Sequence, residues 1–132
     1  MREIVKVFKV LADETKLRIL NLLQERECCV CEVVQALEIS QSRASRGLTA
    51  LYDIGFLKLK KEGLWSLYSL DREAISSYQM EIIEAVKEAL NDNKITALDK
   101  ERLKRAKRVG FKKYGSDSEN QKHILSDLAI KR

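Results

Sequence analysis

The sequence predicts a mainly α-helical fold with a small β-hairpin, and three observations support this fold class. The 132 residues include no Pro and only five Gly, which favours helices over a many-turned β-sandwich. Apolar residues recur at helical spacing through most of residues 3–90. Two short segments on either side of Glu62-Gly63 have the features of paired strands joined by a tight turn.

The composition is that of one folded domain. Apolar residues make up 45% of the chain, which is too high for global disorder. No uncharged apolar run approaches the roughly 18 residues that a membrane span requires. The three cysteines lie together, with none elsewhere to form a disulfide framework. We therefore expect a protein of the reducing cytoplasm that has no membrane partner.

Three short helices are predicted before residue 38. Apolar residues share one face of the first, over residues 3–11. Asp13 is suited to capping the second helix, which is expected to run to about Gln24. The third follows a break at residues 25–27, and its apolar positions have the i, i+3, i+4, i+7 spacing: Val30, Val33, Val34 and Leu37.

A fourth helix has an unusual polar face. Ser40 is suited to capping it, and Gly55 to following its end. Its buried face is expected to hold Ala44, Leu48 and Leu51. The opposite face carries no acid and is rich in short hydrogen-bonding groups, with two arginines: Gln41, Ser42, Arg43, Ser45, Arg46 and Thr49.

After the hairpin a long helix is predicted from Asp71, and its wide apolar stripe is larger than so small a fold can cover. We therefore expect a second copy of the chain to cover part of that stripe, which makes the fold dimeric. The pattern weakens after residue 91. We accordingly expect residues 1–92 to form one folded, dimeric domain, and residues 93–132 a basic C-terminal extension that is partly helical or disordered.

The net charge of +5 comes from the C-terminal part of the chain. Residues 1–91 hold 13 Lys and Arg against 14 Asp and Glu, whereas residues 92–132 hold 12 against 6. The overall basicity is therefore weak evidence for nucleic-acid binding by the folded part. A local basic stretch is stronger evidence, because residues 40–61 contain five cations and Asp53 as their single acid.

Two short helices joined by a tight turn and followed by a hairpin predict a winged helix-turn-helix, so we expect residues 1–92 to be a DNA-binding and dimerisation domain. Such a fold places its second helix in the major groove of DNA, where Arg43 or Arg46 reaches guanine or phosphate and Gln41 reads adenine. The hairpin is expected to place Lys58, Lys60 and Lys61 against phosphates. An ordinary solvated surface is the alternative interpretation of these polar side chains.

Three segments carry a family resemblance: LADETKLRILNLL at 11–23, ECCVCEV at 27–33 and SQSRASRGLTALYDIGFLKLKKEG at 40–63. They are similar to the second helix, the start of the metalloid-binding helix, and the recognition helix with its wing in the ArsR/SmtB family of bacterial metal-responsive repressors. Gly47 stands where a His or similar polar residue is usual in that family. The resemblance implies that Cys29 and Cys31 match the family's binding pair, whereas Cys28 stands where Leu is usual.

The three thiols suit a trivalent metalloid. Cys28, Cys29 and Cys31 offer three soft sulfur ligands, which suits As(III) or Sb(III) as an inducer, whereas zinc prefers four tetrahedral ligands. On a regular helix Cys29 and Cys31 lie about 200° apart. We therefore expect metalloid capture to unwind the start of the third helix and so weaken DNA binding. Burial of the cysteines as small apolar side chains is the structural alternative.

These observations predict a transcriptional repressor that binds operator DNA as a homodimer and is released when thiolates of one subunit bind As(III) or Sb(III). Two alternatives stay open within DNA-binding regulators: control by thiol oxidation, and response to Cd(II), Pb(II) or Hg(II). A metalloid-binding protein without DNA activity is a third. No organic cofactor is expected, and an enzyme is disfavoured because no His base or phosphate-binding Gly loop is visible. The basic run at residues 100–113 is either a solvated helix or a source of additional phosphate contacts.

Overall fold

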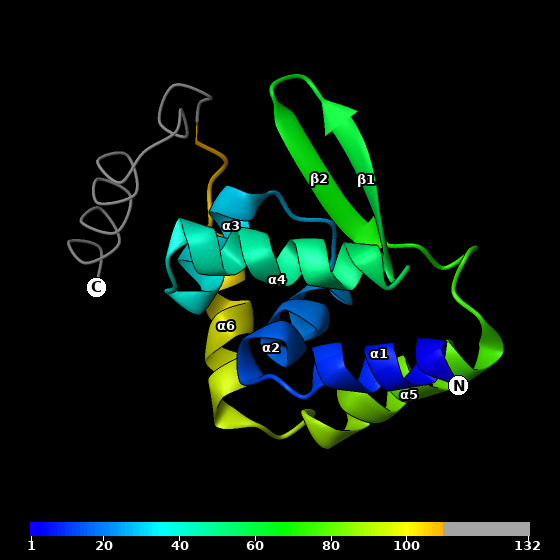
Figure 1. Ribbon diagram of the computed structural model, residues 1–132. Coiled ribbons are helices and arrows are strands. Elements are labelled where there is room, and N and C mark those ends of the chain that lie inside the picture. The colour runs from blue at the N-terminus through cyan, green and yellow to red at the C-terminus, as the bar shows by residue number, and fades with distance from the viewer. Residues whose placement is uncertain (110–132) are drawn as a thin grey trace.

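The computed structural model describes residues 1–109, and it confirms a mainly helical fold with one hairpin (Figure 1). Helices precede and follow a two-stranded antiparallel sheet. The elements in chain order are α1 (Arg2–Leu11), α2 (Glu14–Leu23), α3 (Val30–Leu37), α4 (Gln41–Asp53), β1 (Leu57–Glu62), β2 (Trp65–Leu70), α5 (Ser77–Ala89) and α6 (Lys94–Arg105).

Local side-chain caps fix where the helices begin. The backbone N–H of Lys16 donates to the Asp13 carboxylate at 2.9 Å, and that of Arg43 donates to the Ser40 hydroxyl at 3.2 Å, as the sequence predicts. The last predicted helix differs, because α5 begins at Ser77 rather than near Asp71. The backbone N–H of Ser76 donates to the Gln79 side chain at 3.1 Å, and this cap starts the helix six residues later than periodicity alone indicates.

The hairpin has a continuous register from Leu57 opposite Leu70 to Glu62 opposite Trp65. Gly63 lies in the turn with a φ of +63°, a conformation that glycine adopts without steric cost. Only the base of β1 is buried, because Leu57 is 3% exposed whereas Leu59 is 44% exposed. The hairpin therefore projects beyond α4 as a wing (Figure 1).

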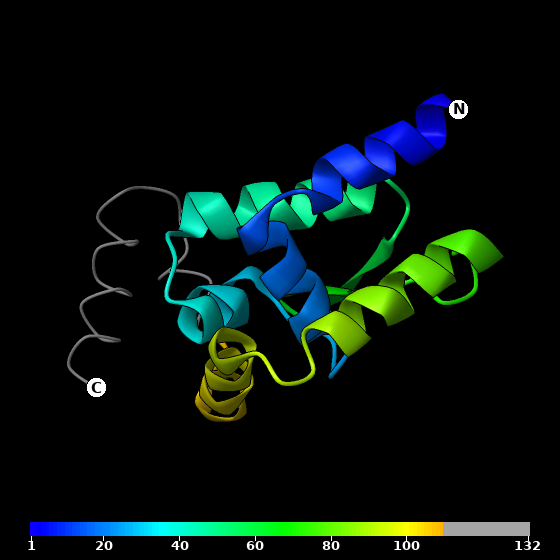
Figure 2. The same cartoon turned by 90° about the horizontal axis from the view of Figure 1, so that it is seen from below.

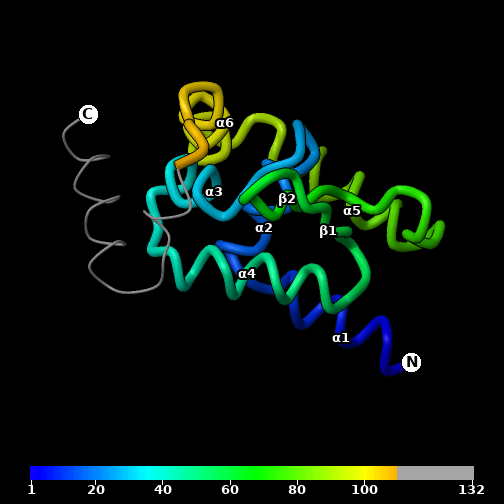
Figure 3. The backbone as a smooth tube through the Cα atoms, turned by 90° about the horizontal axis from the view of Figure 1, so that it is seen from above, coloured from blue at the N-terminus to red at the C-terminus, as the bar shows by residue number. Residues whose placement is uncertain are grey.

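The core lies between α2 and the elements that surround it. Ile19, Leu20 and Leu22 of α2 are fully buried, and they belong to one cluster with side chains of α3 and α4. Helix α3 lies between α4 and α6 (Figure 3). A Cβ atom at Gly47 would meet Cδ1 of Ile19, so the departure from the family pattern at this position lets α4 approach α2 closely.

Helix α6 lies beyond the expected domain boundary at residue 92, and it packs against α2 and α3. Its Asp99 is completely buried and accepts hydrogen bonds from Arg18 of α2 at 2.8 and 2.9 Å. Arg18 also donates to the carbonyl of Leu37, and Arg102 donates to that of Ala36 at 3.0 Å. Helix α6 is therefore part of the folded unit. The pattern of charged and apolar residues along the sequence does not reveal this packing.

Several large apolar side chains stay exposed at the opposite side of the molecule. Helices α1 and α5 extend away from α3 and α6 (Figure 2). On α1, Val7 and Leu11 face the core, whereas Val5 is 42% and Phe8 54% exposed, although the sequence pattern places Phe8 on the buried stripe.

Within residues 1–109, no helix is both long and apolar enough to cross a membrane.

Replacement of Asp99 by Asn is expected to lower the free energy of unfolding by about 3 kcal/mol, because it removes the fully buried carboxylate and leaves the partly buried guanidinium of Arg18 without its counter-charge. Chemical denaturation followed by circular dichroism measures the change. Glu101→Gln is the matched control on the same helix, since its ion pair with Lys104 is exposed and is worth less than about 1 kcal/mol. Equal stabilities for the two variants would contradict the structural role of Asp99.

Candidate functional site

The polar face of α4 is presented to solvent, as predicted. The cap at Ser40 starts the helix, and Ala44, Leu48 and Leu51 anchor it to the core. Of the predicted DNA-binding residues on α4, those with exposed side chains are Ser42, Arg43, Arg46 and Thr49, while Gln41 and Ser45 are half-buried. From Gln41 to Thr49 the helix therefore presents no acid to solvent, which fits the surface of a nucleic acid, and Asp53 is the one acid at its C-terminal end.

Arg43 is already oriented by a neighbouring helix. Its guanidinium donates to the Thr15 hydroxyl at 2.6 Å, and Thr15 lies in the first turn of α2. Arg43, Arg46 and Lys16 line one shallow pocket where α2 meets α4. This arrangement gathers three cations beside the polar face, with Asp13 lining the same pocket, whereas the sequence predicted only the two cations on α4.

The wing carries the three predicted lysines in exposed positions. Lys58, Lys60 and Lys61 all lie on β1. The Nζ atom of Lys60 lies 3.7 Å from a carboxylate oxygen of Glu62, but both side chains are more than half exposed. Such a surface pair contributes little and leaves the lysine able to exchange partners.

Cys28 lies in an extended segment that is joined to the wing. Its backbone N–H donates to the Tyr68 carbonyl at 3.0 Å, and its carbonyl accepts from the Tyr68 N–H at 2.8 Å. Its thiol is free, fully buried and part of the main apolar core. Burial raises the pKa of this thiol to about 12, with the nearby Glu32 carboxylate contributing, so the thiol is protonated at neutral pH.

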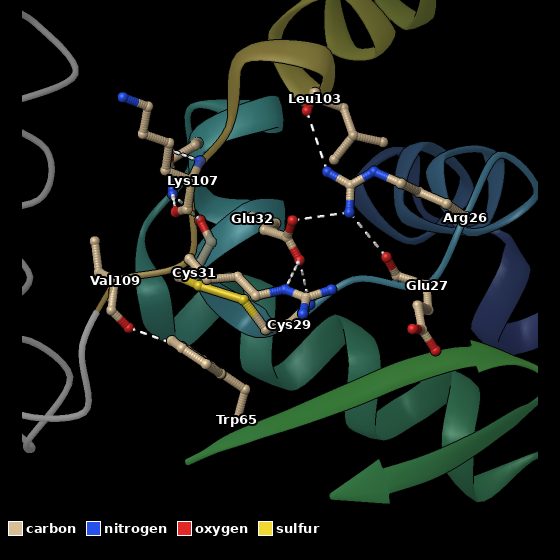
Figure 4. Close-up of a disulfide and its surroundings, with 11 residues drawn as sticks. Arg26, Glu27, Cys29, Cys31, Glu32, Trp65, Leu103, Lys107 and Val109 are labelled. Carbon is tan, nitrogen blue, oxygen red and sulfur yellow. Dashed lines mark hydrogen bonds and ion pairs between the residues drawn. A yellow bond between two sulfur atoms is a disulfide. The ribbon is translucent and has the colours of Figure 1, made fainter. Parts of the chain in front are cut away.

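Cys29 and Cys31 lie together and are joined by a disulfide (Figure 4). Their Cα atoms are 5.4 Å apart. Cys29 is the residue that precedes α3 and has an extended backbone, with φ −87° and ψ 170°, while Cys31 is in the first helical turn. The two sulfurs therefore meet without any unwinding of α3, which corrects the expectation that a regular helix separates them.

The structure does not bring Cys28 to this pair. Side chains of successive residues in an extended segment point to opposite faces, so Cys28 faces the main core and Cys29 faces away from it. Cys29 and Cys31 belong to a separate apolar cluster with Leu67. Within residues 1–109, no three Cys, His, Asp or Glu side chains are arranged to hold a metal ion. A three-thiolate site would therefore require the segment at Cys28 to move.

A pocket of about 140 Å³ adjoins the cysteine pair. It lies where the start of α3, the start of α4 and the tip of the wing meet. Its lining residues are Cys29, Val30, Cys31, Gln41, Leu64, Trp65, Ser66 and Val109. The pair therefore lines one pocket with the first residue of α4 and with residues of the wing.

Sequence reasoning missed the role of Glu32. It is 3% exposed, and its carboxylate accepts hydrogen bonds from Arg26 at 2.8 Å and from Arg108 at 3.3 Å. It also accepts from the backbone N–H of Cys29 at 3.0 Å (Figure 4). Arg26 lies six residues before Glu32, whereas Arg108 comes from the segment after α6, and the two guanidiniums together offset the charge of this carboxylate.

The segment after α6 reaches the wing. The indole N–H of Trp65 donates to the Val109 carbonyl at 2.8 Å, and the Gln35 side chain forms hydrogen bonds with both the backbone N–H and the carbonyl of Lys107.

Several cations of the predicted basic run form ion pairs with acids of the folded domain. These pairs are Lys100 with Glu25, Arg102 with Glu38, Lys104 with Glu101 and Arg108 with Glu32. Lys112, Lys113 and the single histidine, His123, lie outside the described residues.

Comparisons with known proteins agree with this architecture. Residues 13–64 match the family model for bacterial regulatory proteins of the arsR family. The arsenic resistance transcriptional regulator ArsR1 of Pseudomonas putida is 46% identical over 77 residues, which cover 55% of this chain and 60% of that protein. The arsenical resistance operon repressor of Bacillus subtilis is 34% identical over 77 residues, covering 58% of this chain and 73% of that protein.

A solved structure of HlyU from Vibrio cholerae has a TM-score of 0.59 and 30% identity to this chain, covering 69% of this chain and 95% of that one. The chain spans about three-fifths of the length of several curated relatives that it matches. The matched relatives are described as transcriptional regulators or repressors and not as enzymes. The family model spans the helices α2 to α4 and the first strand of the wing, and the chain belongs to the arsR family of bacterial regulatory proteins.

Proposed function

We propose that the protein is a metalloid-responsive transcriptional repressor that binds operator DNA as a homodimer and is released when cysteine thiolates bind As(III) or Sb(III). The observation that carries this proposal is the position of Cys29 and Cys31, which line one pocket with Gln41 of α4 and Ser66 of the wing. A ligand bound by these sulfurs would contact both DNA-binding elements at once. The proposed site of action is the cytoplasm, where operator DNA lies.

Binding to DNA is assigned to α4 and β1. An α-helix fits the major groove, where the exposed Arg46 is placed to contact a base or phosphate, while lysines of the wing contact the adjacent backbone. On binding, Arg43 would either release the Thr15 hydroxyl and contact DNA, or keep this hydrogen bond and hold α2 beside a DNA phosphate. The polar face of α4 supports this assignment because four of its side chains are exposed and no acid lies between Gln41 and Thr49.

The homodimer is assigned to the side of the molecule formed by α1 and α5. Val5 and Phe8 of α1 are large apolar side chains that remain exposed there, and Tyr78, Ile82 and Val86 of α5 are only half-buried. A second copy would cover these side chains. A two-fold dimer places its two recognition helices about 34 Å apart along DNA, which corresponds to one helical turn.

Inorganic arsenic would release the protein from DNA because Cys28, which is separated from the Cys29–Cys31 pair, has to move to bind the same arsenic atom. Arsenous acid loses three hydroxyl groups as water when three thiols replace them, after a cellular thiol has reduced the disulfide. To supply the third sulfur, Cys28 must leave the core and break its two backbone hydrogen bonds to Tyr68 of β2. The wing would then lose its attachment to the segment before α3. Because the coupling is reciprocal, bound DNA weakens metalloid binding by the same factor.

Control by thiol oxidation is a second candidate function, and the disulfide between Cys29 and Cys31 favours it. In this alternative the disulfide and dithiol forms bind DNA with different affinities. Soft divalent ions such as Cd(II), Pb(II) and Hg(II) are further candidate inducers because they too prefer thiolate ligands. A metalloid-binding protein without DNA activity is distinguished from all of these by its failure to bind an operator.

Arg46→Ala is expected to weaken operator binding about tenfold or more, and the double variant with Arg43→Ala further, because each removes a cationic contact to base or phosphate. A mobility-shift titration at two salt concentrations measures both affinity and salt dependence. Lys94→Ala provides the control, because it removes an exposed charge at the start of α6. Unchanged affinity of the double variant would overturn the assignment of α4.

The arsenite response is expected to require Cys29 and Cys31 and to be weakened at least tenfold by Cys28→Ala. Each substitution removes one of three sulfur ligands, while alanine at position 28 retains an apolar side chain in the core. Arsenite concentration at half-release of a labelled operator is the measurement. A Cys29→Ser variant with the full arsenite response would contradict the thiolate site, and Ser69→Ala on the wing serves as the control.

Oxidation separates the two candidate inducing signals. If the metalloid is the signal, reduced protein and protein oxidised by peroxide are expected to bind the operator within about threefold of one another before arsenite is added. Fluorescence anisotropy of a labelled operator provides the comparison. A loss of tenfold or more on oxidation, absent in Cys31→Ser, would favour redox control instead.

A further inference from the structure

We propose that residues 106–109, here called the bracing segment, hold the wing in the orientation that binds DNA, with Trp65 and Gln35 as positioning residues. The inference deepens the proposed function and rests on its DNA-binding part, but it does not depend on the inducer. It assigns a role in DNA binding to a segment that lies outside residues 13–64, which match the family model.

The wing needs support because a two-stranded hairpin is only marginally stable on its own. The base of the wing is held by the buried Leu57 and by the two backbone hydrogen bonds between Tyr68 and Cys28. Trp65 lies beyond these attachments, opposite Glu62 at the turn end of the hairpin. The tip of the wing therefore requires an attachment of its own if its orientation is to be fixed before DNA binds.

The bracing segment supplies this attachment. Helix α6 ends at Arg105, and Ala106 has an extended backbone, with φ −66° and ψ 143°, so the chain leaves the helix and runs to the wing. The Val109 carbonyl accepts the indole N–H of Trp65 at 2.8 Å (Figure 4). Both side chains also pack against the apolar cluster that contains Leu67. One directional hydrogen bond and apolar contact thus hold the tip.

The bracing segment is itself fixed to α3. The Gln35 side chain donates to the Lys107 carbonyl at 2.6 Å and accepts from the Lys107 N–H at 3.0 Å, so it uses both its donor and its acceptor on one residue. It is oriented by a further hydrogen bond to the Cys31 carbonyl, one turn earlier. Arg108 donates to the buried Glu32 carboxylate at 3.3 Å. Helix α3 therefore holds the wing tip through a segment of four residues.

The part of the wing next to this attachment carries two of the lysines assigned to phosphates. Lys60 and Lys61 are exposed, and they lie opposite Leu67 and Ser66, beside Trp65. A wing that is already oriented loses less conformational freedom when its lysines bind, so the attachment raises affinity. Because phosphate contacts carry no sequence information, the bracing segment is expected to set affinity and salt dependence rather than sequence preference.

The test uses the full chain and a fluorescein-labelled duplex of mixed sequence, about 30 base pairs long, because phosphate contacts do not depend on sequence. Trp65→Phe keeps an aromatic ring and removes the N–H donor. It is expected to weaken binding about fivefold, as is typical for the loss of one hydrogen bond. The slope of log affinity against log salt is expected to become shallower by about one to two, because the two lysines lose their phosphates. Fluorescence anisotropy at several salt concentrations measures both, with Ser69→Ala as the wing control.

Gln35→Met tests the other end of the bracing segment and keeps the length of the side chain. It is expected to cause the same losses of affinity and salt dependence, although Gln35 is not on the wing. Gln24→Met is the matched control, because the side-chain nitrogen of Gln24 has no hydrogen-bond partner within residues 1–109. Trp65 is the single tryptophan, so its indole N–H gives one NMR signal. Exchange of that proton with solvent is expected to be at least about tenfold faster in Gln35→Met than in Gln24→Met.

A double-mutant comparison distinguishes positioning of the lysines from a general effect on stability. Trp65→Phe is introduced into the chain that already carries Lys60→Ala and Lys61→Ala. If the bracing segment acts by positioning these lysines, the added substitution is expected to change duplex binding by less than about twofold. A general effect on the fold would produce the full loss in both backgrounds.

The outcomes separate this inference from the proposed function. If the wild-type chain binds the duplex and both Trp65→Phe and Gln35→Met bind it with unchanged affinity and salt slope, the bracing role is wrong and DNA binding stands. A full further loss in the chain without the two lysines would also overturn it. If Trp65→Phe does not fold, Gln35→Met decides the question alone. If the wild-type chain binds no duplex at low salt, both the inference and the DNA-binding proposal fail.

Discussion

The position of α3 depends on two buried carboxylates, one near each end of the helix. Asp99 of α6 lies near the C-terminal end and pairs with Arg18 and Arg102, while Glu32 in the first turn pairs with Arg26 and Arg108. A buried charge without such partners is strongly destabilising, so these pairs fix α2, α6 and the segment after it around α3. Since α3 also carries Cys31 and packs against α4, the same constraint positions the cysteine pair beside the candidate DNA interface.

The cysteine cluster combines two environments in four residues. Cys28 belongs to the segment bonded to Tyr68 and shares the main core, while Cys29 and Cys31 face the pocket under the wing. The division arises from ordinary backbone geometry, because an extended residue is followed directly by a helical turn. Two neighbouring thiols are thereby given different chemistry: one is protonated within apolar surroundings, and the other is paired at the surface of contact between α3, α4 and the wing.

Local patterns predicted the local structure well. The caps at Asp13 and Ser40, the glycine in the hairpin turn and the polar face of α4 all follow from neighbouring residues, and the structure contains each of them. The packing of α6 was missed because its decisive contact joins Arg18 to Asp99, which are 81 residues apart. The pairing of Cys29 with Cys31 was missed because the rotation between them was calculated for a helix that in fact begins after Cys29.

The disulfide encloses only Val30 between its two cysteines. The entropy that a crosslink removes from an unfolded chain depends on the length of the loop it closes, and a loop this short constrains the unfolded chain less than a long loop does. Making or breaking the bond thus changes the chemical state of the site while leaving the melting behaviour of the domain governed by its ion pairs and core. In this chain the oxidation state of Cys29 and Cys31 can therefore change with little effect on the thermal stability of the fold.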